Sequence, residues 1–120
     1  MSFKSILQRA VERVPGAVGA VFADWDGEAV DHFARGVKEE TLILAAHYGV
    51  ILNHVQSALH LSHFGEAEEV IIRHERLDVI IRLVAKEYFV VILVLAAETH
   101  LATALREASA AASALRVEMI

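Results

Sequence analysis

The feature that most constrains the fold is an uninterrupted apolar run, Tyr88–Leu95, with the sequence YFVVILVL. A strand with one face in water alternates apolar and polar residues, whereas a strand without alternation is covered on both faces. Even with Ala96 and Ala97 added, the run is far shorter than the ~20 residues that a membrane-spanning helix needs. We therefore expect Tyr88–Leu95 to be a central strand of a sheet.

Amphipathic helices are predicted near both ends of the chain. Over residues 3–14 apolar residues recur with the helical period, Ser2 precedes them as an N-cap, and Pro15-Gly16 ends the helix. Thr99 can likewise cap a closing helix with one apolar stripe. The first stripe consists of Phe3, Ile6, Leu7, Ala10, Val11 and Val14, and the second of Leu101, Ala104, Leu105, Ala108, Ala112 and Leu115.

Five segments between these helices have strand character. Asp26-Gly27, a pair that favours hairpin turns, joins the first two, and the last three follow Gly65 with short turns between them. We expect strands at Ala17–Asp24, Ala29–Ala34, Glu69–His74, Leu77–Ala85 and Tyr88–Leu95. With one helix in the middle the order of elements is αββαβββα, and we expect residues 1–120 to form a single domain.

The middle of the chain predicts one long helix, from Lys38 to about His63, with two apolar faces. One face holds Leu44, Tyr48, Ile51, Leu52, Val55 and Leu59, and the other holds Ile43, Val50 and Leu61, flanked by His47 and His54. Between them runs a strip of small or polar residues, Ala46, Gly49, Asn53 and Ser57. A surface helix of a monomer needs one apolar face, so we expect the second to meet the same helix of another copy.

The segment VPGAVGAVFADWDGEAV at residues 14–30 combines a helix end, a Pro-Gly pair, a strand of small residues and an Asp-Gly hairpin. With the long central helix and the YFVVILV strand that leads into a final helix, it resembles the roadblock family of dynein-light-chain-like regulators. The resemblance implies an α/β (α+β) sandwich, in which a five-stranded antiparallel sheet lies between one long helix and the two terminal helices. It also implies dimers formed through edge strands and long helices, with Ras-like GTPases or motor complexes as partners. Some bacterial members, of the gliding-motility type, act as GTPase-activating proteins.

Composition excludes several classes of function. The chain has no Cys, hence no disulfide, thiolate nucleophile or Cys-based zinc site, and its net charge of −5 argues against a nucleic-acid-binding surface. Residues 41–65 lack Asp, Glu, Lys and Arg but carry too many polar side chains for a bilayer. The N-terminal segment lacks the apolar core of a signal peptide. We expect a cytoplasmic protein that does not insert into membranes.

The sequence shows no pattern that predicts catalysis or a bound cofactor. No Ser lies in a GxSxG elbow and no Gly-rich phosphate loop is present, so we do not expect an enzyme. His60 with His63, or His47 with His54, could face a metal ion, but a zinc site needs three or four ligands. We interpret these histidines as interface residues, whose charge could make the interface sensitive to pH.

Charged residues near the strands have two interpretations each. Asp24, Asp26, Glu28 and Asp31 form the rim of a solvated hairpin, and their spacing does not match a calcium-binding loop. Arg73, Arg76 and Arg82 could act on a GTPase as an arginine finger. They are more simply explained as partners of Glu68, Glu69 and Glu75 on a sheet edge.

The patterns predict a non-enzymatic homodimer, and the roadblock resemblance implies a regulatory or scaffold protein that binds a small Ras-like GTPase and could act as its GTPase-activating partner. The alternative is a small-ligand or pH-sensing module with a similar α/β fold. Two copies are expected to pair through the edge strand 69–74, whose unpaired backbone groups invite association, and through the second face of the long helix. The predicted interface residues are Ile43, Ala46, His47, Gly49, Val50, His54, Leu61, Glu69, Val70, Ile71, Ile72, Arg73 and His74.

Overall fold

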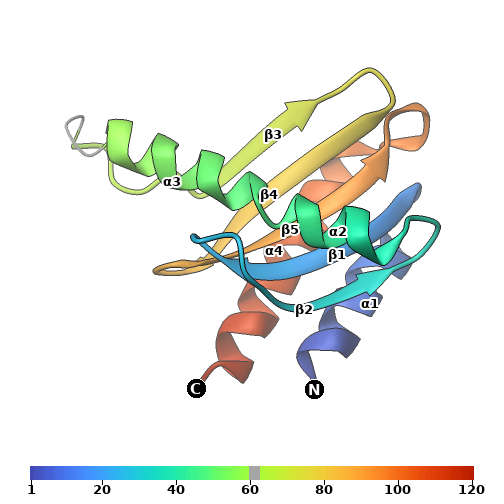
Figure 1. Cartoon of the computed structure of the whole chain (residues 1–120), viewed down its shortest axis with the longest axis horizontal. Helices are drawn as coiled ribbons and strands as arrows, with labels where there is room; N and C mark the ends of the chain where they lie inside the picture. The colour runs from blue at the N-terminus through green and yellow to red at the C-terminus, as the bar shows by residue number, and fades with distance from the viewer. Residues whose placement is uncertain (60–62) are drawn as a thin grey trace.

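The computed structural model describes residues 1–59 and 63–120 of the chain. Its elements follow the predicted order, with the central helix in two parts (Figure 1). They are α1 (Phe3–Arg13), β1 (Ala17–Asp24), β2 (Ala29–Ala34), α2 (Glu39–Ala45), α3 (Tyr48–Leu59), β3 (Glu69–Arg73), β4 (Leu77–Ala85), β5 (Tyr88–Leu95), the short 3₁₀ helix η1 (Ala96–Glu98) and α4 (Leu101–Glu118).

The five strands form one antiparallel sheet in the order β2-β1-β5-β4-β3. The apolar strand β5 lies in the middle, and its residues Phe89–Val94 are all buried, which confirms the expectation drawn from its lack of alternation. The strands β2 and β3 are left as the two edges of the sheet.

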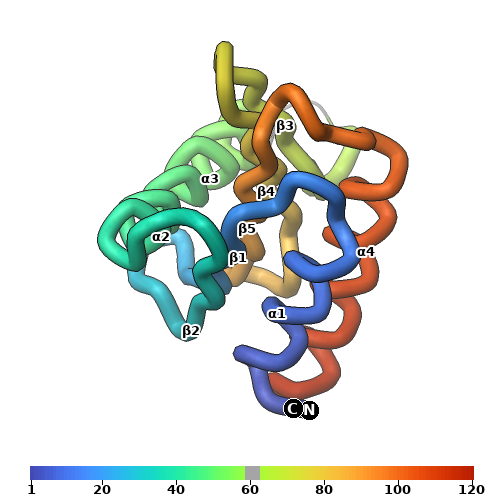
Figure 2. The backbone as a smooth tube through the Cα atoms, turned by 90° about the vertical axis from the view of Figure 1, so that its right-hand side faces the viewer, coloured from blue at the N-terminus to red at the C-terminus, as the bar shows by residue number. Residues whose placement is uncertain are grey.

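The sheet lies between two helical layers (Figure 2). The pair α1 and α4 covers one face, where Val90 and Ile92 of β5 point, and α2 with α3 covers the other, where Val91 and Leu93 point. The predicted α/β sandwich is therefore confirmed. No helix among the described residues has both the length and the apolar character needed to cross a bilayer.

One of the two predicted helix caps is confirmed. The hydroxyl of Ser2 accepts a hydrogen bond from the N–H of Ser5 at 3.1 Å, as an N-cap does. Thr99, in contrast, does not cap α4, which begins after His100. Its hydroxyl donates to the carbonyl of Leu95 at 3.0 Å, because the intervening η1 turn brings that carbonyl within reach.

The central helix is interrupted where the sequence predicts one continuous helix. Around the link between α2 and α3, backbone hydrogen bonds span three residues instead of four: the N–H of His47 donates to Leu44 and that of Val50 to His47, both at 3.0 Å. The predicted C-terminal end of this helix, beyond Leu59, includes residues 60–62, which lie outside the described part of the chain.

The close approach of Gly49 to the sheet explains which face of the central helix is buried. A Cβ atom on Gly49 would lie 1.6 Å from Cζ of Phe89, so only glycine fits this position. The neighbouring Ala46 and Leu52 are fully buried against the same face of the sheet. The assignment of Ala46 and Gly49 to an interface between copies is therefore wrong, because the strip of small residues packs into the protein's own core.

Candidate interaction surface

The edge strand β3 directs a row of backbone groups away from the sheet. The carbonyl of Glu68 accepts the N–H of Leu83 at 2.9 Å, and the N–H of His74 donates to Leu77 at 2.8 Å. Alternate residues of an antiparallel ladder bond to the neighbouring strand, so Val70 also faces β4. The residues whose N–H and C=O groups point outward are Glu69, Ile71 and Arg73, and within the described chain none of these groups has a hydrogen-bond partner.

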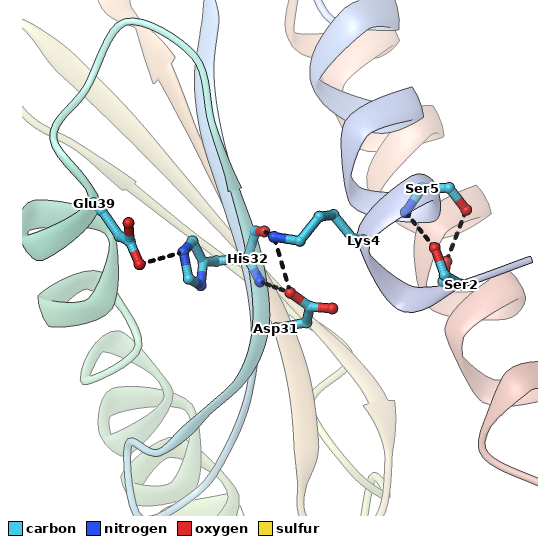
Figure 3. Close-up of polar contacts among 6 residues, drawn as sticks. All are labelled: Ser2, Lys4, Ser5, Asp31, His32 and Glu39. Carbon is cyan, nitrogen blue, oxygen red and sulfur yellow. Dashed lines mark hydrogen bonds and ion pairs between the residues drawn. The ribbon is translucent and has the colours of Figure 1, made fainter.

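The opposite edge, β2, is capped by side chains (Figure 3). At its centre the N–H of His32 donates to Oδ1 of Asp31 at 2.8 Å, and Nζ of Lys4 donates to the carbonyl of His32. Lys4 also lies 3.1 Å from Asp31, and Nε2 of His32 lies 3.0 Å from Glu39 at the start of α2. Since Asp31 and Lys4 occupy the outward N–H and C=O of His32 at the centre of this edge, β2 is a poorer template for another strand than β3.

An apolar stripe, which we call the outer stripe, is exposed on the central helix. Three large residues contribute to it: Leu44 is 66% exposed, Ile43 41% and Ile51 39%. His47 and His54 lie exposed beside them, whereas Val50 is half-buried. A shallow hollow of about 230 Å³ lies among Leu44, His47, Tyr48 and Ile51.

The helix α3 lies along β3, so the outer stripe and the open edge occur on one side of the molecule. At one end, the hydroxyl of Tyr48 lies 3.1 Å from Nε2 of His74, directly after β3. At the other end, the Gln56 side chain donates to the carbonyl of Ala67 at 2.7 Å and accepts its N–H at 2.6 Å, just before β3. The two elements therefore run antiparallel, as Figure 1 also shows.

Charged side chains of β3 pair with β4 on the sheet face that α4 covers. Nε of Arg73 lies 3.3 Å from Oδ1 of Asp78, whose side chain is buried. The buried Oε1 of Glu69 lies 3.7 Å from the Arg82 guanidinium, which is an ion pair but too long for a hydrogen bond, and Oε1 accepts no other hydrogen bond among the described residues. Burial raises the pKa of Glu69, although the nearby Arg82 acts in the opposite direction.

Other candidate groups from the sequence do not converge on a site. No cluster of three metal-ligating side chains occurs within residues 1–59 and 63–120, and His60 and Leu61 lie outside those ranges. The acidic hairpin is held by Asp24, whose Oδ1 accepts the N–H groups of Asp26 and Glu28 at 3.0 Å each. The rim thus stabilises its own turn.

Two hollows of the surface offer little to a small ligand. One of about 50 Å³ lies between α1 and α4, beside Arg9 and Glu107. Another of about 260 Å³ lies near Phe3 and Tyr88, open to solvent at the end of the sheet. Neither contains a convergent set of polar groups of the kind that orients a bound ligand.

Sequence reasoning misses several groups that shape this surface. It assigns no role to Lys4, the second residue of α1, because its contact with the carbonyl of His32 on the edge strand β2 depends on how the helix packs. It treats Gln56 as one of several polar residues, and nothing in the local sequence signals the two bonds of Gln56 to Ala67. It also places Leu44 and Ile51 on the opposite, buried face.

Comparison with known proteins supports the fold. No family model and no curated protein matches the sequence. Among solved structures, a Roadblock/LC7 domain from Streptomyces avermitilis superposes with a TM-score of 0.83 at 14% identity, covering 97% of this chain and 96% of that one. An MglB with a tetrameric arrangement gives a TM-score of 0.82 at 18% identity, covering 93% and 83%. MglC from Myxococcus xanthus is 27% identical, with a TM-score of 0.70 over 98% and 99% of the two chains.

These neighbours define a class. They are Roadblock/LC7 domain proteins and MglB or MglC proteins, one of them described as a gliding protein, from Thermus thermophilus. The open five-stranded antiparallel sheet between two helical layers is the roadblock fold, and the chain has it from α1 to α4. The resemblance drawn from the sequence is confirmed at this level.

Proposed function

We propose that this protein is a non-enzymatic regulatory or scaffold module that acts as a homodimer and binds a small Ras-like GTPase. The observation that carries the proposal is the combination, on one side of the molecule, of an uncapped edge strand with an exposed apolar stripe. Isolated strand edges and apolar patches both favour association, and evolution covers them when they serve no partner.

A second copy satisfies both parts of this surface. Two β3 strands related by a two-fold axis are antiparallel, so each supplies the hydrogen-bonding groups that the other lacks. The proposed interface contains β3 with His74 and the outer stripe, including Ile43, His47 and His54, with Leu44 and Ile51 in addition. The tetrameric arrangement of one MglB neighbour supports self-association in proteins with this fold.

The GTPase partner is supported by the roadblock fold and by the family resemblance in the sequence. In such a complex the GTPase and its Mg²⁺ carry out hydrolysis, and the regulator positions the mobile switch segments. Arg73 and Arg82 are already paired with carboxylates of this chain, whereas the Arg76 side chain is exposed at the β3–β4 turn. Arg76 is therefore the better candidate for a contact with bound nucleotide.

Two measurements test the proposal. Light scattering at micromolar concentration should give about twice the chain mass of 13.2 kDa, and a value at the chain mass would contradict the homodimer. The immobilised protein should then retain a small GTPase from its native lysate in one nucleotide state, with GDP compared against a non-hydrolysable GTP analogue. Absence of any GTPase in both states would contradict the partner assignment.

A further inference from the structure

Not every residue in and beside β3 has outward backbone groups that a second strand could bind. Ala67 lies two residues before Glu69, so in an extended chain its N–H and C=O also point outward, but the Gln56 side chain binds both. At the other end the chain turns back, since the N–H of His74 already donates to Leu77. Along this edge, within the described residues, only Glu69, Ile71 and Arg73 therefore have outward groups available to a second strand.

Three two-fold registers place at least two of these three residues opposite one another, and they are centred on Val70, Ile71 or Ile72. The register centred on Ile71 uses all three residues, because Glu69 then faces Arg73 of a second copy and Ile71 faces itself. Centring on Val70 would require the outward groups of Ala67, which Gln56 occupies. Centring on Ile72 would require residues of the turn after β3.

The charges of β3 select the same register. The strand reads Glu-Val-Ile-Ile-Arg, so it carries an acid at one end and a base at the other, both on one face of the sheet. In the register centred on Ile71, each Glu69 lies opposite an Arg73 of the other copy, and cross-strand pairs of opposite charge are favourable. In the register centred on Val70, the Glu69 side chains of the two copies would instead lie near each other. In the register centred on Ile72, the two Arg73 side chains would do so.

The side chains next to β3 extend this pattern. Within one chain, Arg73 pairs with Asp78, and Oε1 of Glu69 lies 3.7 Å from the Arg82 guanidinium. Joining two copies about Ile71 would place Asp78, Arg73, a second Glu69 and a second Arg82 in one row across four strands. The signs alternate along that row, so each charge would have neighbours of opposite sign.

We propose that two copies of this chain join β3 to β3 in a single register, with the two-fold axis at Ile71 and two reciprocal Glu69–Arg73 ion pairs. This inference rests on the homodimer proposed above and specifies its geometry. Each of the three hydrogen-bonded pairs contributes two backbone bonds, and Val70 of each copy lies opposite Ile72 of the other beneath the α3 helices.

Single cysteines test the register directly, because the chain has no Cys of its own. In Val70→Cys, Ile71→Cys and Ile72→Cys, the new thiol lies on the axis of one register each, within the distance that a disulfide can bridge. Under mild oxidation, we expect Ile71→Cys to form the covalent dimer fastest. Faster cross-linking at position 70 or 72 would overturn the register. A dimer by mass that none of the three cross-links would overturn the strand pairing, and a monomer by mass would overturn the homodimer itself.

Neutralising the ion pair provides a second measurement without cysteine. Glu69→Gln keeps the shape of the side chain, and with two pairs lost we expect the dimer dissociation constant to rise about tenfold at low salt. The matched control is Glu87→Gln, an exposed acid in the β4–β5 turn, which should leave the constant unchanged. Equal constants for both variants would contradict the Glu69–Arg73 pairing.

Discussion

Replacing Gly49 by alanine is a sharp test of the packing that orients the helical layer. In an unobstructed helix interior this change stabilises by about 1 kcal/mol, because alanine has the higher helix propensity. Here the added Cβ would lie 1.6, 1.9 and 2.4 Å from three carbons of the Phe89 ring. Phe89 is fully buried, as is the neighbouring Leu52, so the ring has no space into which to turn.

The expected effect follows from these two opposing contributions. Overpacking a closed core costs about 3 kcal/mol at the upper end of the usual range, since α3 or Phe89 must move by more than an ångström. After subtracting the propensity gain of about 1 kcal/mol, Gly49→Ala should destabilise the fold by about 2 kcal/mol. In a domain of this size that lowers the melting temperature by about 8 °C.

Equilibrium urea unfolding, followed by far-UV circular dichroism at one fixed protein concentration, measures this effect. Ser57→Ala is the control on the same helix, because Ser57 is exposed, and we expect a change within about 0.5 kcal/mol. Adding Phe89→Leu to Gly49→Ala should recover part of the loss, so that the two changes are less than additive. If Gly49→Ala instead raises stability, as in a solvated helix, the described contact between α3 and β5 is wrong.

Three further predictions concern the two edges and the outer stripe. Ile51→Asp should raise the dimer dissociation constant more than tenfold, since it would place a charge in the apolar contact once from each copy. Ser57→Asp on the same helix should leave the constant unchanged, and the mass of each variant measured on dilution tests both expectations. Lys4→Ala removes the cap on β2 and should produce assemblies larger than the dimer, visible by light scattering, whereas Gln8→Ala should not. Equal masses for the two variants would show that Lys4 does not protect this edge. Burial raises the pKa of Glu69, so the folded chain binds a proton on this carboxyl more tightly than the unfolded chain does. The free energy of unfolding that this proton contributes is present below the ordinary pKa of 4.5 and is lost as the pH rises through the raised pKa. Glu69→Gln should therefore stabilise the diluted monomer at pH 7 but not at pH 3, and equal urea midpoints for both proteins at pH 7 would contradict the burial.

The sequence is informative about the fold because its main signals are local. The lack of alternation in Tyr88–Leu95 places β5 at the centre, and the Asp-Gly pair together with Pro15-Gly16 marks where α1 ends and the first hairpin turns. Hydrophobic periodicity requires no knowledge of what each element packs against. For that reason the order of elements and the sandwich can both be predicted.

The failures involve contacts between distant residues. A helical wheel assigns the large apolar residues to the core, whereas here the small strip at Ala46 and Gly49 faces the sheet, because the Phe89 ring fills the space beneath it. The break between α2 and α3 has no Pro or Gly at Ala46-His47 to signal it. The capping of β2 by Lys4 and the clamp of Gln56 on Ala67 likewise depend on tertiary placement.

The central claim is that the outward edge of β3 joins two copies, and a proline at Ile71 tests it most directly. The N–H of Ile71 points away from β4, so Ile71→Pro removes a donor needed only by a second strand, as prolines do at sheet edges. Ile71→Val is the control, since it keeps that donor and the β-branched side chain. We expect masses near twice 13.2 kDa for the natural chain and Ile71→Val, and a folded monomer for Ile71→Pro by light scattering and circular dichroism. A folded Ile71→Pro protein that remains a dimer would contradict the account.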